Sequence, residues 1–210
     1  VLDEADRMLD MGFMPQIRRV FLRMPDERQN LLFSATLPKE VESLVEDFLP
    51  GAERVQIGSR SQSASTITHR FAAVSVSDKP SALERLLFNE TGKGLVFCNK
   101  KIGCEKLGNM LKRAGLPADS IHGDKSAEAR HMCLGAFSRG RTRFLIATDV
   151  AGRGIDVDDV ELVVNYDFPL ALEDYIHRSG RTGRAGKKGR AVSFVAPSEK
   201  RLYEAVKAHL

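Results

Sequence analysis

The sequence predicts an α/β protein in which helices flank a parallel β-sheet. Short apolar runs rich in branched residues, such as Gly94 to Cys98 and Val160 to Asn165, alternate with amphipathic stretches. Runs of this kind are typical of strands buried on both faces, as in parallel sheets. Polar or glycine-rich segments follow several of the runs, which is where α/β sheets place their ligands.

Six segments are expected to be strands, and helices are expected between them. One helical face carries Cys104, Leu107 and Leu111, with Gly115 as a stop, and a second stripe repeats apolar residues near the C-terminal end. We interpret both stripes as core. The expected strands are residues 31–33, 71–76, 94–98, 143–147, 160–165 and 191–195.

The chain of 210 residues is expected to contain two parts joined by a linker. Residues 58–65, with the sequence GSRSQSAS, contain one apolar residue and are typical of a flexible linker. Residues 66–210 are long enough for a complete α/β domain, whereas residues 1–57 hold too few strands to close a sheet. The first part is therefore expected to be the end of another domain.

Composition sets only broad limits on function. The hydrophobic share of 42% is ample for a packed core, and a net charge of +4 permits a nucleic-acid partner without requiring one. Basic residues concentrate in the last third, which equally fits a solvated face. Three cysteines without paired spacing predict reduced core thiols, and no signal peptide or membrane-length apolar run is present, so we expect a cytoplasmic protein.

Residues 177–186, with the sequence HRSGRTGRAG, place Arg178, Arg181 and Arg184 three apart among glycines. Guanidinium groups match phosphate oxygens, and glycines let the backbone approach a ligand, which favours an anion carrying several oxygens. The segment contains too much glycine for a stable helix by itself. The alternative is a solvated basic loop, and the spacing alone does not decide between them.

Three further polar segments follow apolar runs. Residues 3–6 read DEAD; a carboxylate there can hold Mg²⁺, although acidic residues also suit a helix start. Ser34 and Thr36 flank one small residue, and Thr36 can equally cap a helix. The third segment, residues 147–156, offers a hydroxyl, carboxylates and glycines to phosphate and sugar, although Asp149 can equally cap a short helix.

Together these segments resemble the motifs of DEAD-box RNA helicases, in the family's order. The segments are DEAD at 3–6, SAT at 34–36, IHGDKSAEAR at 121–130, ATDVAGRGID at 147–156 and HRSGRTGR at 177–184. The apolar run 95–97 is similar to a further motif. The sequences VLDEADRMLDMGF and RQNLLFSAT most resemble the bacterial RhlE-type subgroup.

The resemblance implies two RecA-like domains with ATP and RNA in the cleft between them. Residues 1–57 would end the first domain, and residues 66–210 would form the complete second domain. Arg181 and Arg184 would act as arginine fingers on the γ-phosphate, and Phe97 would pack beneath a finger arginine. An ATP-dependent RNA helicase would couple hydrolysis in this cleft to local unwinding of RNA.

The resemblance also implies a role for each of the remaining site residues. Asp3 would hold Mg²⁺, through water, and Glu4 would position the attacking water, while Asp156 would bind the ribose. Two sets complete the site: Asp6, Ser34, Thr36 and His177 would couple domain closure to catalysis, and Gly123, Arg130 and Thr148 would hold RNA phosphates.

The sequence departs from the family pattern in three ways. Gly152 stands where alanine is usual, and Ala127 stands where glutamine is usual, which puts one polar contact near RNA in doubt. The GKT phosphate loop and the adenine-reading Q motif are absent from the 210 residues, and we expect them upstream of Val1. The fragment alone is therefore predicted to lack ATPase activity.

Two other functions fit parts of the pattern. A non-catalytic module that clamps the RNA backbone would explain the late basic residues, but it has no use for DEAD and two finger arginines. A DNA-unwinding relative would use the same cleft, and competition between RNA and DNA would distinguish it.

Overall fold

The computed structural model describes residues 1–10, 12–34, 36, 37, 39–56, 66–152, 157 and 159–210. The chain divides into two compact units, Val1–Gln62 (unit 1) and Ser63–Leu210 (unit 2). The expected linker, residues 58–65, lies outside the described residues. No helix among the described residues is both long and apolar enough to cross a membrane.

Unit 1 is helical in its described part. Its helices are α1 (Ala5–Asp10), α2 (Met14–Phe21) and α3 (Lys39–Phe48). The segment expected as a strand at residues 31–33 forms only an isolated parallel bridge, between Leu2 and Leu32. This prediction was wrong because an apolar run becomes a strand only where a partner extends the pairing, and Leu2 pairs through a single bridge.

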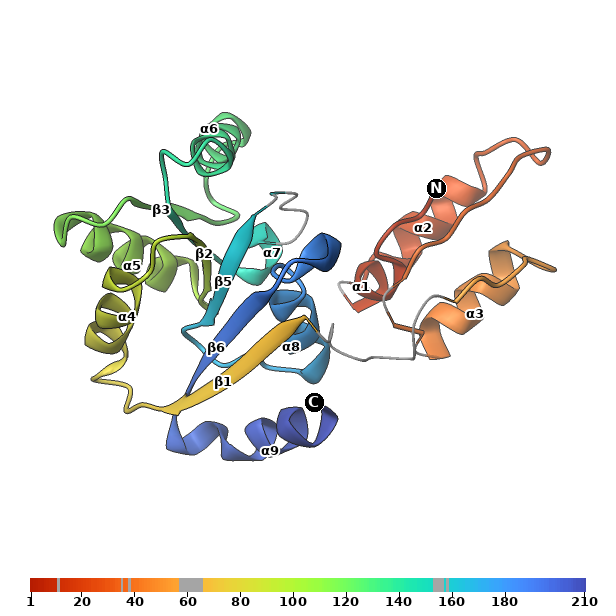
Figure 1. Ribbon diagram of the computed structural model, residues 1–210. Helices are drawn as coiled ribbons and strands as arrows, with labels where there is room; N and C mark the ends of the chain where they lie inside the picture. The colour runs from red at the N-terminus through yellow and green to blue at the C-terminus, as the bar shows by residue number, and fades with distance from the viewer. Residues whose placement is uncertain (11, 35, 38, 57–65, 153–156, 158) are drawn as a thin grey trace. The chain divides into compact units, whose positions relative to one another are not determined.

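Unit 2 is built on a six-stranded sheet in the order β1-β6-β5-β2-β4-β3, in which every pairing is parallel (Figure 1). The strands are β1 (Ile67–Ala73), β2 (Lys93–Phe97), β3 (Ala118–Ile121), β4 (Phe144–Ala147), β5 (Val160–Asn165) and β6 (Gly189–Val195). The predicted parallel α/β architecture is confirmed for this unit.

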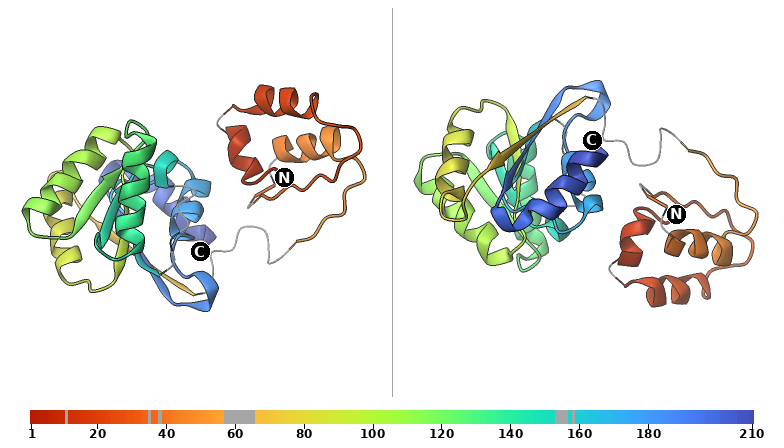
Figure 2. Two further views of the ribbon diagram at one scale, coloured as in Figure 1. Left: turned by 90° about the horizontal axis from the view of Figure 1, so that it is seen from above. Right: turned by 90° about the horizontal axis from the view of Figure 1, so that it is seen from below.

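Helices cover both faces of this sheet (Figure 2). Alternate residues of β2 divide between two cores: Val96 packs with α4 and α5, whereas Leu95 and Phe97 pack with α6 and α7. A third cluster joins α8 and α9 to β1. The helices are α4 (Lys79–Phe88), α5 (Lys101–Arg113), α6 (Ala127–Ser138), α7 (Asp149–Gly152), α8 (Leu172–Ser179) and α9 (Lys200–His209), with 3-10 turns at Arg184–Gly186 and Pro197–Glu199.

Two strands differ from their predicted positions. The expected strand 71–76 lies earlier, at Ile67–Ala73, because β6 sets its register from Ile67 opposite Gly189 to Ala73 opposite Val195. The strand Ala118–Ile121 was not predicted, since Asp119 and Ser120 have weak strand preference. In the structure both polar side chains have hydrogen-bond partners: Asp119 accepts from Lys112 at 2.9 Å, and Ser120 donates to Glu105 at 2.6 Å.

The expected thiols and the expected core stripe of α5 are found in the structure, whereas the stripe Leu202, Val206 and Leu210 is core only in part, because Leu210 is 45% exposed. Leu107 and Leu111 of α5 are buried, and so is Val206 of α9. All three cysteines are free and buried. Burial raises the pKa of the Cys133 thiol, so this thiol stays protonated and behaves as a core group.

Candidate functional site

In unit 1, the DEAD and SAT segments are joined by hydrogen bonds. The Asp6 amide donates to Ser34 Oγ at 3.1 Å, and Asp6 Oδ2 accepts from both the amide and the hydroxyl of Thr36, at 2.8 and 2.7 Å. Ser34 Oγ donates in turn to the Thr36 carbonyl at 2.6 Å. Asp6 is buried, so these bonds satisfy a carboxylate that would be costly to leave without donors.

The two acidic residues before this cluster are more exposed. The Glu4 amide donates to Asp3 Oδ1 at 2.9 Å, and Asp3 is exposed. Glu4 has a φ of 50°, in the left-handed region that non-glycine residues rarely adopt. Local strain of this kind is often retained at functional sites, which supports a functional interpretation of Glu4.

Asp3 fits a magnesium contact by its chemistry. Mg²⁺ keeps several waters in proteins and is commonly held by one or two carboxylates together with substrate phosphates. Among the described residues there is no cluster of three or more metal-ligating side chains. A single exposed carboxylate is compatible with the expected contact through water.

In unit 2, the three arginines of residues 177–186 have different environments. His177 and Arg178 lie in the last turn of α8, so this part of the segment is helical although its glycines predicted otherwise. Arg178 is buried, with 2% of its surface exposed, whereas Arg181 is half-buried and Arg184 is exposed. The burial of Arg178 therefore fits neither of the two alternatives that the spacing left open for it, an anion site or a solvated loop.

Arg178 is held by acceptors from several strand ends. Its Nε and one terminal nitrogen donate to the two oxygens of Asp149, at 2.6 and 2.7 Å. Further bonds reach the Asn99 side chain at 2.7 Å and the Asp167 carbonyl at 2.7 Å. Phe97 packs under this guanidinium, 5.3 Å from the ring centroid, and not under a finger arginine as expected.

The turn between Arg181 and Arg184 is anchored to the sheet. Thr182 is buried, and its hydroxyl donates to the Val160 carbonyl at 2.5 Å. Gly183 has a φ of 70°, and a Cβ there would lie 2.6 Å from Ile67, so only glycine fits. The Gly183 carbonyl accepts from Thr66 Oγ1 at 2.9 Å. Arg181 and Arg184 therefore flank a fixed turn.

A small hollow of about 40 Å³ lies beside this turn, and both finger candidates line it together with Lys187 and Asp159. Lys187 pairs with Asp159 across it. Pockets for small-molecule ligands and cofactors measure roughly 300–1,000 Å³. The hollow is therefore too small to be a nucleotide pocket.

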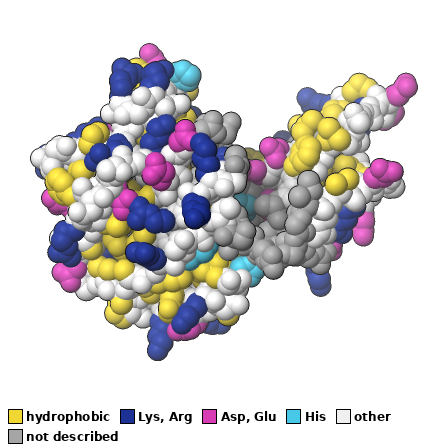
Figure 3. Space-filling model, in the orientation of Figure 1, with side chains coloured by type: hydrophobic (Ala, Val, Ile, Leu, Met, Phe, Trp, Pro, Cys, Tyr) yellow, Lys and Arg dark blue, Asp and Glu magenta, His cyan; other side chains and the backbone are white. Residues whose placement is uncertain are grey.

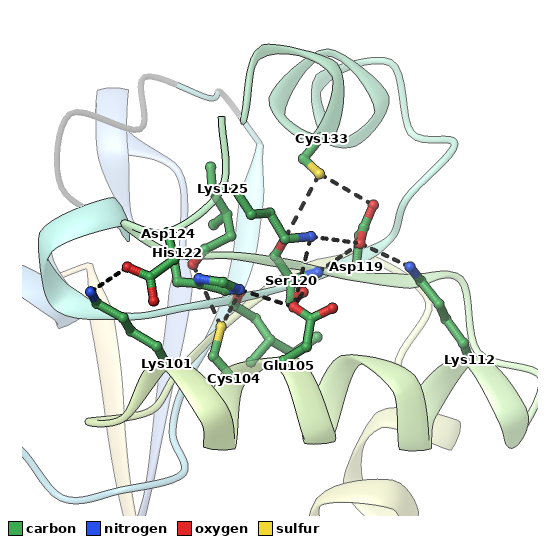
Figure 4. A network of polar contacts seen from close by, with 12 residues as sticks. Lys101, Cys104, Glu105, Lys112, Asp119, Ser120, His122, Asp124, Lys125 and Cys133 are labelled. Atoms are coloured by element: carbon green, nitrogen blue, oxygen red, sulfur yellow. Dashed lines mark hydrogen bonds and ion pairs between the residues drawn. The ribbon is translucent and has the colours of Figure 1, made fainter. Parts of the chain in front are cut away.

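Of the expected RNA residues, Gly123 follows the edge strand β3, Thr148 follows its neighbour β4, and Arg130 lies in α6. Gly123 and Arg130 are exposed, and Thr148 is buried with 6% of its surface exposed, so it offers RNA little area. Lys101 lies over Gly123 and donates to Asp124 at 2.5 Å (Figure 4). Asp156 lies outside the described residues.

The network behind Gly123 is organised by Glu105. Its Oε2 accepts from Ser120 at 2.6 Å and lies 3.0 Å from His122 Nε2 (Figure 4). The hydrogen bond from Ser120 lowers the pKa of Glu105, with a further contribution from His122. Sequence reasoning did not identify this network, because its members come from α5 and β3 and only the fold brings them together.

Charge on the visible face of unit 2 is mixed. Lys and Arg side chains are interspersed with acidic ones on this face and do not form one continuous patch (Figure 3). Particular contacts, and not the overall charge, therefore carry the argument for an RNA site on this unit.

Comparison with known proteins identifies the class first. The profile described as "Helicase conserved C-terminal domain" matches residues 78–186, and the profile "DEAD/DEAH box helicase" matches residues 1–44. A structure of Saccharomyces cerevisiae Dbp5 bound to RNA and ADP BeF3 is 34% identical, with a TM-score of 0.90, over 99% of this chain and 56% of that chain. The α/β fold of unit 2 is thus RecA-like, of the helicase class.

The curated relatives narrow this class to a family. "ATP-dependent RNA helicase DbpA" of Bacillus subtilis is 41% identical over 100% of this chain, and "DEAD-box ATP-dependent RNA helicase 20" of Arabidopsis thaliana is 48% identical over 96%. The chain belongs to the DEAD-box ATP-dependent RNA helicase family. It spans 44% and 41% of the lengths of these two relatives. The RhlE-type subgroup stays a prediction.

Proposed function

We propose that this chain is the part of an ATP-dependent RNA helicase that supplies the arginine fingers and one RNA-binding surface. One observation carries the proposal: Arg181 and Arg184 flank an anchored turn beside a hollow far smaller than a nucleotide. Arginines presented in this way are suited to a phosphate bound on another surface. There they would stabilise charge that develops during phosphoryl transfer, worth roughly 10³ to 10⁵ in rate in comparable enzymes.

Unit 1 would supply the acidic groups of the same reaction. Asp3 would hold Mg²⁺ through water, and Glu4 would orient the attacking water and accept its proton. The metal, when bound, would neutralise charge on the phosphates. The exposure of Asp3 and the left-handed backbone of Glu4 support these roles.

The coupling residues would link the state of the bound nucleotide to the affinity for RNA. They are Asp6, Ser34, Thr36 and His177. In unit 1 the hydrogen bonds of Asp6 with Ser34 and Thr36 support a shared role, because moving one of these groups must disturb the others. His177 would complete this set from unit 2, where it precedes Arg178 on α8.

RNA would be held through its phosphates by Gly123, Arg130 and Thr148, and the ribose of ATP by Asp156. Phosphate contacts position a strand without reading its bases, so little sequence preference is expected. The bound RNA in the Dbp5 structure supports the choice of ligand. Closure on ATP would bend one strand, and its partner strand would separate locally.

Unit 1 would be the C-terminal part of a first RecA-like domain, completed by an N-terminal half with the GKT loop and the Q motif. A largely apolar cavity of about 240 Å³ in unit 1, lined by Ile17, Val20 and Phe21 among others, supports this proposal. Val20 and Leu22 are exposed by 58% and 82%, which fits a surface that another part of a domain covers. Without that half, no ATPase activity is expected.

The test is ATPase activity after mixing this chain with a separately expressed DEAD-box half that carries the GKT loop, with and without RNA. We expect RNA-dependent hydrolysis only in the mixture. Arg181→Ala or Arg184→Ala should lower it by roughly 10³-fold or more, because each removes a positive charge from the transition state. Glu4→Gln should abolish turnover while nucleotide binding remains.

Arg201→Ala is the matched control, because it removes an exposed arginine from α9 of the same unit. If the rate of hydrolysis is unchanged in Arg181→Ala and Arg184→Ala, the role of these residues as arginine fingers is contradicted. Robust RNA-stimulated hydrolysis by the 210-residue chain alone would contradict the two-half site. If no hydrolysis appears although the halves associate in a binding assay, an RNA clamp without catalysis becomes the better explanation.

A further inference from the structure

Arg178 occupies the position at which α/β sheets usually hold a ligand. Its contacts come from Asn99 after β2, Asp149 after β4 and Asp167 after β5. These strand ends are neighbours in the sheet, because β2 lies between β5 and β4, and the chain crosses over β2 between β4 and β5. Crevices at such crossing points are the common ligand sites of parallel sheets. Here the Arg178 side chain lies at this crossing point.

The pairing of Arg178 with Asp149 is directional as well as electrostatic. Two parallel bonds of 2.6 and 2.7 Å join the guanidinium to both carboxylate oxygens, and the ring of Phe97 supports the guanidinium from one side. Such bidentate pairs fix the orientation of the two side chains, which a single hydrogen bond does not. α7 and α8 therefore cannot rotate against each other without breaking two charge-assisted bonds.

Each partner of this pair adjoins a residue of the proposed function. Asp149 directly follows Thr148, one of the proposed RNA residues. Arg178 directly follows His177, and its carbonyl accepts from the Arg181 amide at 3.1 Å. The pair therefore connects the segment that carries Thr148 to the segment that carries Arg181.

We propose that Arg178 is a positioning residue that couples RNA contacts at Thr148 to the orientation of Arg181, through its paired bonds to Asp149. The proposal rests on the proposed function, since it requires RNA at Thr148 and a finger at Arg181. Arg178 itself is buried and touches neither ligand. Its role is to make α7 and α8 move as one body.

The experiment follows backbone amide resonances of the isotope-labelled 210-residue chain while a short oligouridine is added. In the wild type, we expect the Thr148 and Arg181 resonances to shift together and to saturate at the same RNA concentration. In Asp149→Asn, Gly123 and Arg130 should still respond, while the Arg181 response falls roughly threefold or more. Arg178→Lys should lower the Arg181 response to a similar extent, because an ammonium group cannot make the bidentate pair with Asp149.

Arg190→Lys is the matched control, since Arg190 pairs with Glu90 elsewhere in unit 2. This variant should keep the full Arg181 response. A full response in folded Asp149→Asn and Arg178→Lys would overturn the coupling. If the Arg181 resonance of the wild type does not shift while those of Gly123 and Arg130 do, the coupling is overturned too, but the proposed RNA surface is retained.

Silence at Gly123, Arg130 and Thr148 together would remove the RNA surface, and the coupling with it. If both variants unfold, the wild-type titration decides. Joint saturation of Thr148 and Arg181 supports the coupling, and independent behaviour overturns it.

Discussion

The segment HRSGRTGRAG has an inner half that carries Arg178 and an outer half that carries Arg181 and Arg184, and these arginines differ in environment. Arg178, at the end of α8, is buried against Asp149 and Asn99, whereas Arg184 is exposed and its Nε donates to the nearby Gly180 carbonyl. The buried arginine holds the fold together, and the outer arginines are presented by an anchored turn. A regular spacing of arginines therefore does not imply a shared function.

The largest expected effect comes from breaking the buried half. Arg178→Met should destabilise unit 2 by about 3 kcal/mol, because it leaves Asp149, Asn99 and the Asp167 carbonyl without their donor. Denaturant unfolding of the 210-residue chain, followed by circular dichroism, measures this loss.

The double variant Arg178→Met with Asp149→Asn is the informative control. It should cost less than the sum of the single variants, by about 1–3 kcal/mol, because neither partner is then left charged and alone. Strict additivity would mean that the pair contributes nothing specific to the anchoring of α8.

A second anchor of α8 allows the comparison to be sharpened by pH. Tyr175, one turn before Arg178, has its hydroxyl 2.7 Å from His69 Nδ1 on β1. Burial lowers the pKa of His69, so the unfolded chain takes up this proton at a higher pH than the folded chain. The contribution of neutral His69 to folding stability is complete above the unfolded pKa of about 6.5, and it is lost as the pH falls below that value.

The free energy of unfolding, measured between pH 8 and pH 5, tests this expectation, because this range brackets the unfolded pKa of about 6.5. His69→Asn should flatten the profile, since asparagine keeps a polar group near the Nδ1 position but does not titrate. Exposed His131→Asn is the control and should leave the profile unchanged. A wild-type stability that does not change through this range would contradict the prediction.

The smallest expected effect on stability comes from the outer half. Arg181→Ala and Arg184→Ala should each change the free energy of unfolding by less than about 0.5 kcal/mol, because neither side chain is fully buried. The same denaturation experiment measures it. A loss as large as that of Arg178→Met would show that the two halves do not differ, and the comparison would fail.

The sequence by itself determined the parallel α/β class, the family motifs and the core stripe of α5. These follow from local composition, because buried strands read as continuous apolar runs and helices repeat their apolar residues every three to four positions. The runs at Gly94–Cys98 and Val160–Asn165 were predicted on this basis, and β2 and β5 lie there. The short polar strand Ala118–Ile121 gave no such signal.

Only the tertiary structure decided what each polar residue does. Asp149 and Arg178 are 29 residues apart, and nothing local indicates that they pair or that Asn99 joins them. One signal was present: the strand Val160–Asn165 ends in an asparagine, which is buried and whose Oδ1 accepts from Arg178 at 3.4 Å. Burial and direction of a side chain depend on which strand ends the sheet order brings together. For that reason the spacing of three arginines could not decide between an anion site and a solvated loop, and the fold separates the arginines into an anchor and two presented side chains.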